Sequence, residues 1–284
     1  MRIGFVGLGV MGFPMARHLA AAGHALSVFN RSPEKAVRFV EGHGGRAAES
    51  AAEAAHGAEA LILCVGNDDD VRAVVSAALD DLAPGAVIVD HTTTSARVAR
   101  EMAERAGAAG RAFIDAPVSG GQAGAENGTL TVMAGGDEAA FERMVPVISA
   151  YGRAIRRMGG PGAGQLTKMV NQICIAGVLQ GLSEAVHFAR RAGLELEAVQ
   201  AAISKGAAQS WQLDNRWGTM AEGKFDFGFA VDLMRKDLGI ALDEARANGA
   251  SLAMTALVDQ FYAEVQGLGG RRWDTSSLVA RLER

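Results

Sequence analysis

The sequence predicts a doubly wound α/β sheet over residues 1–160 and an all-α domain over residues 161–284. Three observations lead to this fold class. Short apolar runs alternate with amphipathic stretches through the first half, as in parallel strands joined by right-handed helical crossovers. The alternation stops at Gly159-Gly160-Pro161-Gly162, the strongest turn-forming run in the chain. Beyond this run the apolar spacing becomes helical, and almost no strand pattern remains.

Apolar runs of strand length occur throughout the first half, separated by stretches of helical spacing. The strands are expected at Ile3–Val6, Ala25–Phe29, Ala60–Val65, Ala86–Asp90, Ala112–Asp115, Leu130–Ala134 and Ala154–Arg157. The early helices are expected at Pro14–Ala22, Pro33–Glu41, Asp68–Ala78 and Ser95–Ala106. Helices joining parallel strands in this way should cover both faces of the sheet.

The second half is expected to contain helices alone. Their predicted positions are Gln165–Arg191, Glu197–Ser204, Val231–Asn248 and Leu252–Gln266. The first of these is long and mostly apolar, so most of its surface must be buried. It is therefore expected to pack inside its own domain or against a second subunit.

The bulk composition excludes several classes of protein. The chain has 284 residues, a hydrophobic fraction of 49% and a net charge of −4, which suits two folded domains and gives no basic surface for nucleic acid. No uninterrupted apolar run approaches the ~20 residues that span a bilayer, and glycines and Pro14 interrupt the N-terminal run, unlike a secretion signal. Cys64 and Cys174 form no Cys-x-x-Cys pair. We therefore expect a cytoplasmic protein with packed thiols and with neither a membrane nor a nucleic-acid partner.

A glycine-rich motif follows the first strand. Gly7-Leu8-Gly9-Val10-Met11-Gly12 opens a helix within a strand–helix–strand unit, which is the context in which G-x-G-x-x-G binds a dinucleotide. Gly7 permits the tight turn, Gly9 lets the backbone approach a pyrophosphate, and Gly12 lets the helix pack on the strand. The phosphates would lie at the helix N-terminus, with Val10 and Met11 among the cofactor-binding residues. If the motif binds a dinucleotide, the N-terminal domain is a Rossmann-type domain. The alternative is that the motif is a tight strand-to-helix turn that binds no ligand.

The residues after the second strand select between the two nicotinamide dinucleotides. An acidic residue there would bind the ribose hydroxyls of NAD, but this chain has Asn30-Arg31-Ser32. A cation flanked by hydrogen-bonding side chains suits a 2′-phosphate, which predicts a preference for NADP, with NAD still possible. The alternative is that Arg31 stacks on the adenine or faces solvent.

Three more loops should lie at the same edge of the sheet, where ligands of such folds bind. Val65 begins the first, Thr93 lies within the second (90–95), and Ser119-Gly120-Gly121 ends the third. The Ser/Thr cluster of the second loop either caps the next helix or offers hydroxyls to a nicotinamide amide or a substrate. The N–H groups of Ser119-Gly120-Gly121 suit a carboxylate.

The polar cluster with the clearest chemical meaning follows the domain boundary. Lys168, Asn171 and Gln172 share one face of the long helix, which is otherwise apolar around them. Burial, the positive end of the helix dipole and an oxidised nicotinamide would all favour a neutral amine, which suits a general acid/base for alcohol–carbonyl interconversion. The alternative is that Lys168 forms an ion pair with a carboxylate.

The remaining candidates carry weaker signals. Phe229 and Lys236 lie near the C-terminus, where a charged helix face would be unremarkable. The six histidines form no H-x-x-x-H pair and adjoin no cysteine or carboxylate cluster, so we expect no metal site. His91 lies near the proposed site but receives no role.

Taken together, these segments resemble the 3-hydroxyisobutyrate dehydrogenase family, or β-hydroxyacid dehydrogenases, which includes tartronate semialdehyde and glyoxylate/succinic semialdehyde reductases. The similarity covers essentially the whole chain. It is carried by four segments: Gly4-Phe5-Val6-Gly7-Leu8-Gly9-Val10-Met11-Gly12, Asp115-Ala116-Pro117-Val118-Ser119-Gly120-Gly121 continuing to Leu130, Gly162-Ala163-Gly164-Gln165-Leu166-Thr167-Lys168-Met169-Val170-Asn171-Gln172, and Lys236-Asp237.

The resemblance implies a role for each matching position. Lys168 would be the catalytic acid/base, and Asn171 would position the substrate. The substrate carboxylate would be held by Ser119, Gly120 and Gly121, and Phe229 would line the pocket. Thr93 and Lys236 would approach the cofactor, with Asn30-Arg31-Ser32 similar to NADP-using members. Gln172 departs from the second Asn of many members, and Thr92 replaces a common Ser, which weakens any choice of substrate.

The implied reaction is reversible hydride transfer between NADP(H) and a short 3-hydroxyacid or semialdehyde. Candidate substrates are of the 3-hydroxyisobutyrate, tartronate semialdehyde, and succinic semialdehyde or glyoxylate types. The resemblance also implies a homodimer or homotetramer formed through the long helix. Two alternatives stay open: an imine or other carbonyl reductase on the same scaffold, and a dinucleotide-binding module without turnover. Lys168 argues against imine reductases, which usually lack it, and the Lys168/Asn171 pair argues against the module.

Overall fold

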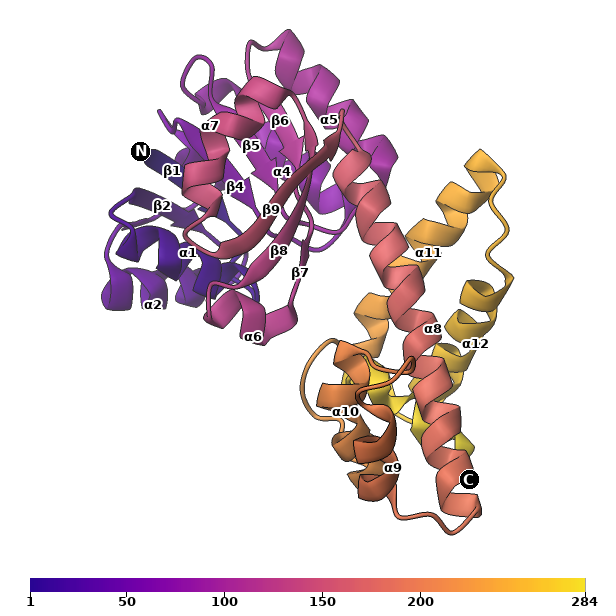
Figure 1. Ribbon diagram of the computed structural model, residues 1–284. Helices are drawn as coiled ribbons and strands as arrows, with labels where there is room; N and C mark the ends of the chain where they lie inside the picture. Colours follow the sequence, from indigo (N-terminus) through magenta and orange to yellow (C-terminus); the bar gives the residue numbers. More distant parts are fainter. Residues whose placement is uncertain (284) are drawn as a thin grey trace. The chain divides into compact units, whose positions relative to one another are not determined.

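The computed structural model describes residues 1–283 and contains two compact units, Met1–Lys168 and the chain from Met169 onward. Figure 1 shows the strands in the first unit, while the second consists of helices. The predicted fold class, a Rossmann-type α/β sheet followed by an all-α part, is confirmed. Each unit is built around its own apolar core.

A nine-stranded sheet forms the centre of the first unit. Its strands are β1 (Arg2–Val6), β2 (Ala25–Phe29), β3 (Arg46–Ala47), β4 (Ala60–Leu63), β5 (Val87–Asp90), β6 (Ala112–Asp115), β7 (Val118–Ser119), β8 (Leu130–Gly136) and β9 (Gly152–Gly159). The spatial order is β3-β2-β1-β4-β5-β6-β8-β7, with β9 also paired to β8. The strands from β3 to β6 run parallel, β8 is antiparallel to β6 and β7, and β9 is parallel to β8.

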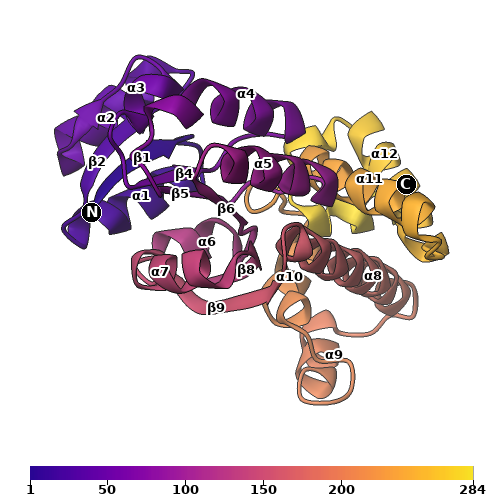
Figure 2. The ribbon, with the colours of Figure 1, turned by 90° about the horizontal axis from the view of Figure 1, so that it is seen from above.

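Helices cover both faces of this sheet (Figure 2). They are α1 (Gly12–Ala21), α2 (Pro33–His43), α3 (Ala51–Ala55), α4 (Asp68–Ala78), α5 (Ala96–Ala108), α6 (Gly121–Glu126) and α7 (Glu138–Ile148), with a short 3₁₀ turn at Leu79–Asp81. Helices α1, α2 and α7 pack on one face, and α3, α4 and α5 pack on the other. In β4, for example, Ile62 faces the first layer, while Leu61 and Leu63 face the second. Burial on both faces explains the uninterrupted apolar runs in the sequence.

The predicted elements are present, some with the predicted bounds and the others with shifted ends, but several short elements were not predicted. Strands β3 and β7 and helices α3 and α6 have two to six residues each, too few for a periodic pattern. Helix α7, which Asp137 caps through the N–H of Ala140 and which contains Pro146, was also not predicted. The strand predicted at Ala154–Arg157 extends over the whole of β9.

The second unit is helical. It contains most of α8 (Ala163–Arg191), together with α9 (Leu196–Ile203), α10 (Trp211–Glu222), α11 (Val231–Asn248) and α12 (Ala253–Gly267), and 3₁₀ turns at Gly270–Arg272 and Thr275–Leu282. One apolar cluster joins α8 to α11 and α12, and another joins α8 to α10. Helix α10 was not predicted; Ser210 caps it, and it buries Trp217.

Helix α8 is long and apolar enough to cross a bilayer by length and composition alone, with a mean hydropathy of 1.2. Of its most apolar stretch, 44% is buried inside the protein. Core helices of globular proteins meet the same criterion, so α8 needs no membrane to explain its composition.

Candidate active site

The carboxyl ends of the parallel strands are aligned by hydrogen bonds between their first loop residues and the neighbouring strands. Gly7 donates its N–H to the carbonyl of Phe29, and Cys64 donates to Val6. In the same way His91 donates to Leu63, and Ala116 to Asp90. Because each loop begins at the same level, the sequence-predicted residues that follow β1, β2, β4, β5 and β6 all lie along one edge.

The glycine-rich loop leaves space for a ligand at one position and has none at two others. A Cβ at Gly7, whose φ is 101°, would lie 2.1 Å from the carbonyl oxygen of Cys64. A Cβ at Gly12 would lie 1.9 Å from the carbonyl oxygen of Gly7, so both are glycine for internal packing. A Cβ at Gly9 would meet no described atom within 4 Å beyond its neighbours. The fold itself therefore gives no steric reason for glycine at position 9, whereas a pyrophosphate approaching the backbone would.

The N-terminus of α1 is also suited to a phosphate. Within residues 1–283, no side chain caps this end, and no acidic residue lies in its first turn. Helix N-termini present N–H groups and a positive dipole to anions. The loop and the helix end together fit the pyrophosphate of a dinucleotide.

Asn30 shapes this loop. Its Oδ1 accepts the N–H of Leu8 at 2.9 Å, and its Nδ2 donates to the carbonyl of Ser32 at 3.1 Å. The amide oxygen thus holds the glycine loop against the end of β2, while the amide nitrogen fixes the Asn30 side chain within its own loop. Ser32 precedes α2 without capping it.

Arg31 is 82% exposed and forms an ion pair with Asp70, with 3.2 Å between Nη1 and Oδ1. The other carboxylate oxygen of Asp70 accepts the N–H of Gly66 at 3.1 Å. The pair therefore links the loop after β2 to the first turn of α4, and the Gly66 bond extends the link to the loop after β4. An exposed ion pair of this kind contributes little to stability, so an anionic ligand can replace the carboxylate at small cost.

The Ser/Thr cluster after β5 has mainly structural contacts. Ser95 caps α5 through the N–H of Val98 and also donates to Asp68. Thr92 accepts the N–H of Val65 at 3.0 Å, which fixes the neighbouring loop. Thr93 is partly exposed, and Thr94 is buried. Ser95 of this cluster therefore caps the next helix, and the contact of Thr93 with a ligand stays a prediction.

The segment after β6 turns through two glycines. Gly120 and Gly121 have φ values of 128° and 61°, a conformation that side-chain-bearing residues rarely adopt. Both glycines are exposed, and Ser119 is half-buried. This places an exposed turn with a neighbouring hydroxyl beside the aligned strand ends, as the predicted carboxylate site requires.

His91, which received no role from the sequence, lies in the core of this edge. Its Nδ1 donates to the carbonyl of Ala116 at 2.6 Å, and its Nε2 accepts the hydroxyl of Tyr151 at 2.7 Å. Burial lowers the pKa of His91 to about 4, so the ring is neutral and makes both contacts with its single proton on Nδ1. His91 thus supports the loop that leads to Ser119.

Lys168 is buried, with 7% of its surface exposed, and is the last residue of the first unit. Two buried polar residues hold the start of its helix. Asp115, at the end of β6, accepts the N–H groups of Gly162 and Gln165. Gln165 bonds through its side chain to the backbone of Thr92 and Thr94.

A polar chain in the second unit starts at Asp237, which is buried. Its Oδ2 accepts Nε2 of Gln172 at 2.7 Å, and Oε1 of Gln172 accepts Nδ2 of Asn171 at 2.8 Å. Because a carboxylate only accepts, it fixes the orientation of the Gln172 amide, which in turn fixes that of Asn171. Asn171 therefore turns its carbonyl oxygen away from Gln172.

The two C-terminal candidates flank different carboxylates of the second unit. Nζ of Lys236 lies 3.2 Å from Oδ1 of Asp237. Phe229 packs against the cluster of α8, α11 and α12, and its N–H donates to buried Asp274 at 3.0 Å. Both residues are partly exposed.

Sequence reasoning gave no individual role to Asp115, Gln165 or Asp70. Asp115 could have been singled out, because an acidic residue that ends a strand buried on both faces needs a partner. Nothing in the sequence alone pairs Asp70 with Arg31, since the two are far apart in the chain.

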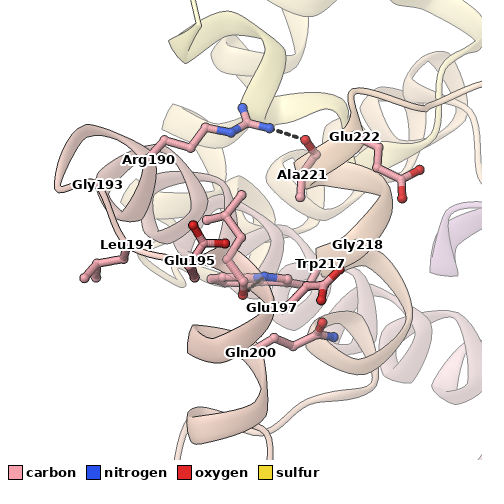
Figure 3. A pocket seen from close by; sticks show the side chains of 11 residues that line it. Arg190, Gly193, Leu194, Glu195, Glu197, Gln200, Trp217, Gly218, Ala221 and Glu222 are labelled. Carbon is pink, nitrogen blue, oxygen red and sulfur yellow. Dashed lines mark hydrogen bonds between the residues drawn. The ribbon is translucent and has the colours of Figure 1, made fainter.

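A pocket of about 500 Å³ lies in the second unit (Figure 3). Its lining includes the apolar side chains of Leu194 and Trp217 and the carboxylates of Glu195, Glu197 and Glu222. Arg190 reaches across and donates to the carbonyl of Ala221. The pocket contains none of the residues predicted for chemistry. Across residues 1–283, no three His, Cys, Asp or Glu side chains lie in an arrangement that could bind a metal ion.

Comparison with known proteins divides the chain into two matched segments. Residues 2–160 match a family profile described as the NAD binding domain of 6-phosphogluconate dehydrogenase. Residues 162–282 match a profile described as the NAD-binding region of NADP-dependent 3-hydroxyisobutyrate dehydrogenase. Together the two profiles cover nearly the whole chain.

Relatives match over the same length. An uncharacterized oxidoreductase of Shewanella frigidimarina is 60% identical, covering 100% of this chain and 98% of that protein. The 2-hydroxy-3-oxopropionate reductase of Escherichia coli is 36% identical, with 100% and 97% covered. The structure of Mycobacterium tuberculosis 3-hydroxyisobutyrate dehydrogenase with L-serine has a TM-score of 0.92 and 32% identity, with 100% and 99% covered.

Proposed function

The chain belongs to the 3-hydroxyisobutyrate dehydrogenase family of nicotinamide-dependent hydroxyacid dehydrogenases, and we propose that it interconverts a short 3-hydroxyacid and its semialdehyde with NADP(H). The family and the oxidoreductase activity are those that the sequence predicted. One observation carries the finer proposal. A buried lysine, Lys168, lies in the first turns of α8, three residues after Gln165, which is bonded to the loop that follows β5.

The dinucleotide is proposed to bind along the aligned strand ends. Gly7, Gly9 and Gly12, with Val10 and Met11 at the start of α1, would hold the pyrophosphate, and the geometry of this loop fits it. Val65 and Thr93 would contact the nicotinamide half from the next two loops. When bound, the nicotinamide supplies or accepts the hydride.

Asn30, Arg31 and Ser32 are proposed to hold the adenosine ribose. The exposed guanidinium of Arg31 is the group that would pair with a 2′-phosphate, and this supports a preference for NADP over NAD. Asp70 would compete with that phosphate for Arg31. When NAD binds, the ion pair between Arg31 and Asp70 can stay intact. The preference for NADP over NAD therefore depends on the free energy of breaking this ion pair.

Lys168 is proposed to be the general acid/base. In the reductive direction its ammonium donates a proton to the oxygen of the aldehyde, and in the oxidative direction its amine removes the hydroxyl proton. Ser119, Gly120 and Gly121 would hold the substrate carboxylate through a hydroxyl and backbone N–H groups. Asn171 would orient the substrate oxygen, and Phe229 and Lys236 would line the substrate and cofactor positions, as the family resemblance implies.

The same proposal extends to domain roles and assembly. Residues 1–160 would bind NADP, and residues 161–284 would supply the substrate and dimerisation domain. Val170, Val178 and Phe188 are exposed apolar residues on α8, which supports a homodimer or homotetramer formed through this helix. A cytoplasmic location accords with a bound nicotinamide cofactor and with the reduced thiols of Cys64 and Cys174.

The function is tested with a panel of substrates followed by the absorbance of the reduced nicotinamide. The panel contains tartronate, succinic and methylmalonate semialdehydes, glyoxylate and, in the oxidative direction, 3-hydroxyisobutyrate and L-serine. We expect turnover of at least one semialdehyde, faster with NADPH than with NADH. Turnover of a cyclic imine alone, or binding of NADPH without turnover of any member, would contradict the proposal.

A further inference from the structure

Asp115 connects the end of β6 to the beginning of α8. One carboxylate oxygen accepts the N–H of Gly162 at 2.8 Å, and the other accepts the N–H of Gln165 at 2.9 Å. Gly162 directly precedes α8 and Gln165 lies in its first turn, where N–H groups have no partner inside the helix. A single side chain from the sheet therefore caps the helix that carries Lys168.

Gln165 makes a second, independent connection. Its Oε1 accepts the N–H of Thr94 at 3.0 Å, and its Nε2 donates to the carbonyl of Thr92 at 2.8 Å. The side chain is fully buried, so losing either bond would leave an unsatisfied polar group. Asp115 fixes the helix through its backbone and Gln165 fixes it through a side chain, so the helix can neither slide nor rotate without breaking one of them.

Two glycines allow this close approach. A Cβ at Gly164 would lie 2.3 Å from the carbonyl oxygen of Met133 and 2.6 Å from that of Asp115. A Cβ at Gly135 would lie 2.6 Å from Oδ1 of Asp115. The backbone of α8 is therefore in direct van der Waals contact with the backbones of β6 and β8. A contact between backbones is stiffer than one made through flexible side chains.

We propose that Asp115 and Gln165 are positioning residues for Lys168. The amine of Lys168 stays at the reacting oxygen only while both connections between α8 and the sheet are intact. This inference rests on the proposed function of Lys168. Lys168 follows Gln165 by three residues, so the two side chains are neighbours on the helix surface. A rotation of the helix that released Gln165 would displace the amine as well. Displacement of a reacting group by about 1 Å costs on the order of 10²-fold in rate.

The test uses Asp115→Asn and Gln165→Met, with Asp137→Asn as the matched control. Asp137 likewise caps a helix, α7, through the N–H of Ala140, but α7 carries no proposed site residue. We expect both test variants to lose about 10-fold or more in kcat, while the Kd for NADPH changes less than about 3-fold. The control should keep its kcat.

Two further measurements distinguish positioning from general destabilisation. In a Lys168→Ala background, Gln165→Met should lower kcat no further, because its effect passes through the missing amine. Acylation of Lys168, read by mass spectrometry against exposed Lys205, should rise severalfold in both test variants and not in the control. If Asp115→Asn does not fold, Gln165→Met decides the outcome.

Unchanged kcat and unchanged Lys168 acylation in folded Gln165→Met would overturn the inference. An equal loss of kcat in the wild-type and Lys168→Ala backgrounds would do the same. If the unmodified enzyme turns over no substrate, the proposed function fails, whereas the acylation experiment still tests whether Asp115 and Gln165 hold Lys168 in place.

Discussion

Arg31 and Asp70 form an ion pair of 3.2 Å between the loop that follows β2 and the first turn of α4. The Arg31 side chain is 82% exposed, so this pair is weak and its guanidinium remains accessible to a ligand. Replacing Arg31 with Ala should lower kcat/KM for NADPH by about 10- to 100-fold, the worth of hydrogen bonds to a charged group, and change kcat/KM for NADH little. Asp70→Asn should shift the ratio toward NADPH, because it removes the competing carboxylate.

Steady-state kinetics with both dinucleotides measures these ratios. Arg46→Ala is the control, since Arg46 is another exposed arginine of the first unit that pairs with a carboxylate, that of Glu53. Equal losses with NADPH and NADH in Arg31→Ala would show that Arg31 does not read the 2′-phosphate.

The glycine loop gives a prediction that separates ligand binding from folding. Gly9→Ala places a methyl group where no described atom lies within 4 Å beyond the neighbouring residues, so the melting temperature should stay unchanged. The methyl group should nevertheless weaken NADPH binding by about 10-fold or more, because it occupies the space needed for the pyrophosphate. Gly12→Ala should instead lower the melting temperature, since its Cβ would lie 1.9 Å from the carbonyl oxygen of Gly7. Equal Kd values for NADPH in the wild type and Gly9→Ala would argue against this phosphate site.

Two buried titratable groups should give the stability of the protein opposite dependences on pH. Burial raises the pKa of Asp115 from 3.8 to about 7, against the lowering effect of its N–H donors. The folded state then binds a proton that the unfolded state lacks, so this group's contribution is full below pH 3.8 and is lost as the pH rises toward 7. Burial lowers the pKa of His91 from 6.5 to about 4. Its contribution is full above pH 6.5 and is lost as the pH falls toward 4.

Urea unfolding between about pH 4 and 6.5 measures this balance. In the wild type the two slopes oppose each other. In Asp115→Asn the effect of His91 remains, so the free energy of unfolding should rise with pH by up to about 1.4 kcal/mol per pH unit. In His91→Gln the effect of Asp115 remains, so the free energy of unfolding should fall as the pH rises. Identical slopes in the two variants would contradict the assignment.

The chain from Asp237 through Gln172 to Asn171 predicts a defect in substrate binding. Gln172→Leu removes the bond that orients the Asn171 amide, so KM for the substrate should rise by about 2- to 10-fold, with the Kd for NADPH unchanged. Gln180→Leu is the control, because Gln180 lies on the same helix, is nearly buried and donates to Glu184 instead. A similar rise in KM in both variants would indicate a general effect on α8.

The sequence was sufficient for the order of the long elements, because strands buried on both faces and amphipathic helices leave periodic patterns. Val231–Asn248 was placed correctly at both ends, and the spacing of Gly7, Gly9 and Gly12 was enough to single out the loop at which a dinucleotide is proposed to bind. Short elements such as α3 and β7 could not be found, since their conformation depends on tertiary contacts rather than on a repeating pattern.

Polar contacts between residues far apart in the chain could not be predicted from the sequence either. Asp115 and Gln165 are separated by 50 positions, and only the return of the chain at α8 brings them together. Asn30 was expected to flank Arg31 at a 2′-phosphate, but both ends of its amide contact the backbone, so its proposed role now includes shaping the loop. Such pairings depend on register and on side-chain rotamers, which leave no trace in composition or periodicity.

Comparing kcat of Lys168→Ala with that of the wild type, on the best substrate of the panel with saturating NADPH, tests the acid/base role most directly. A loss of about 10²–10⁴-fold is expected, with the Kd for NADPH and the melting temperature nearly unchanged, since the amine would act on the proton transfer alone. Retention of most of the wild-type turnover in a folded, NADPH-binding Lys168→Ala enzyme would contradict the account.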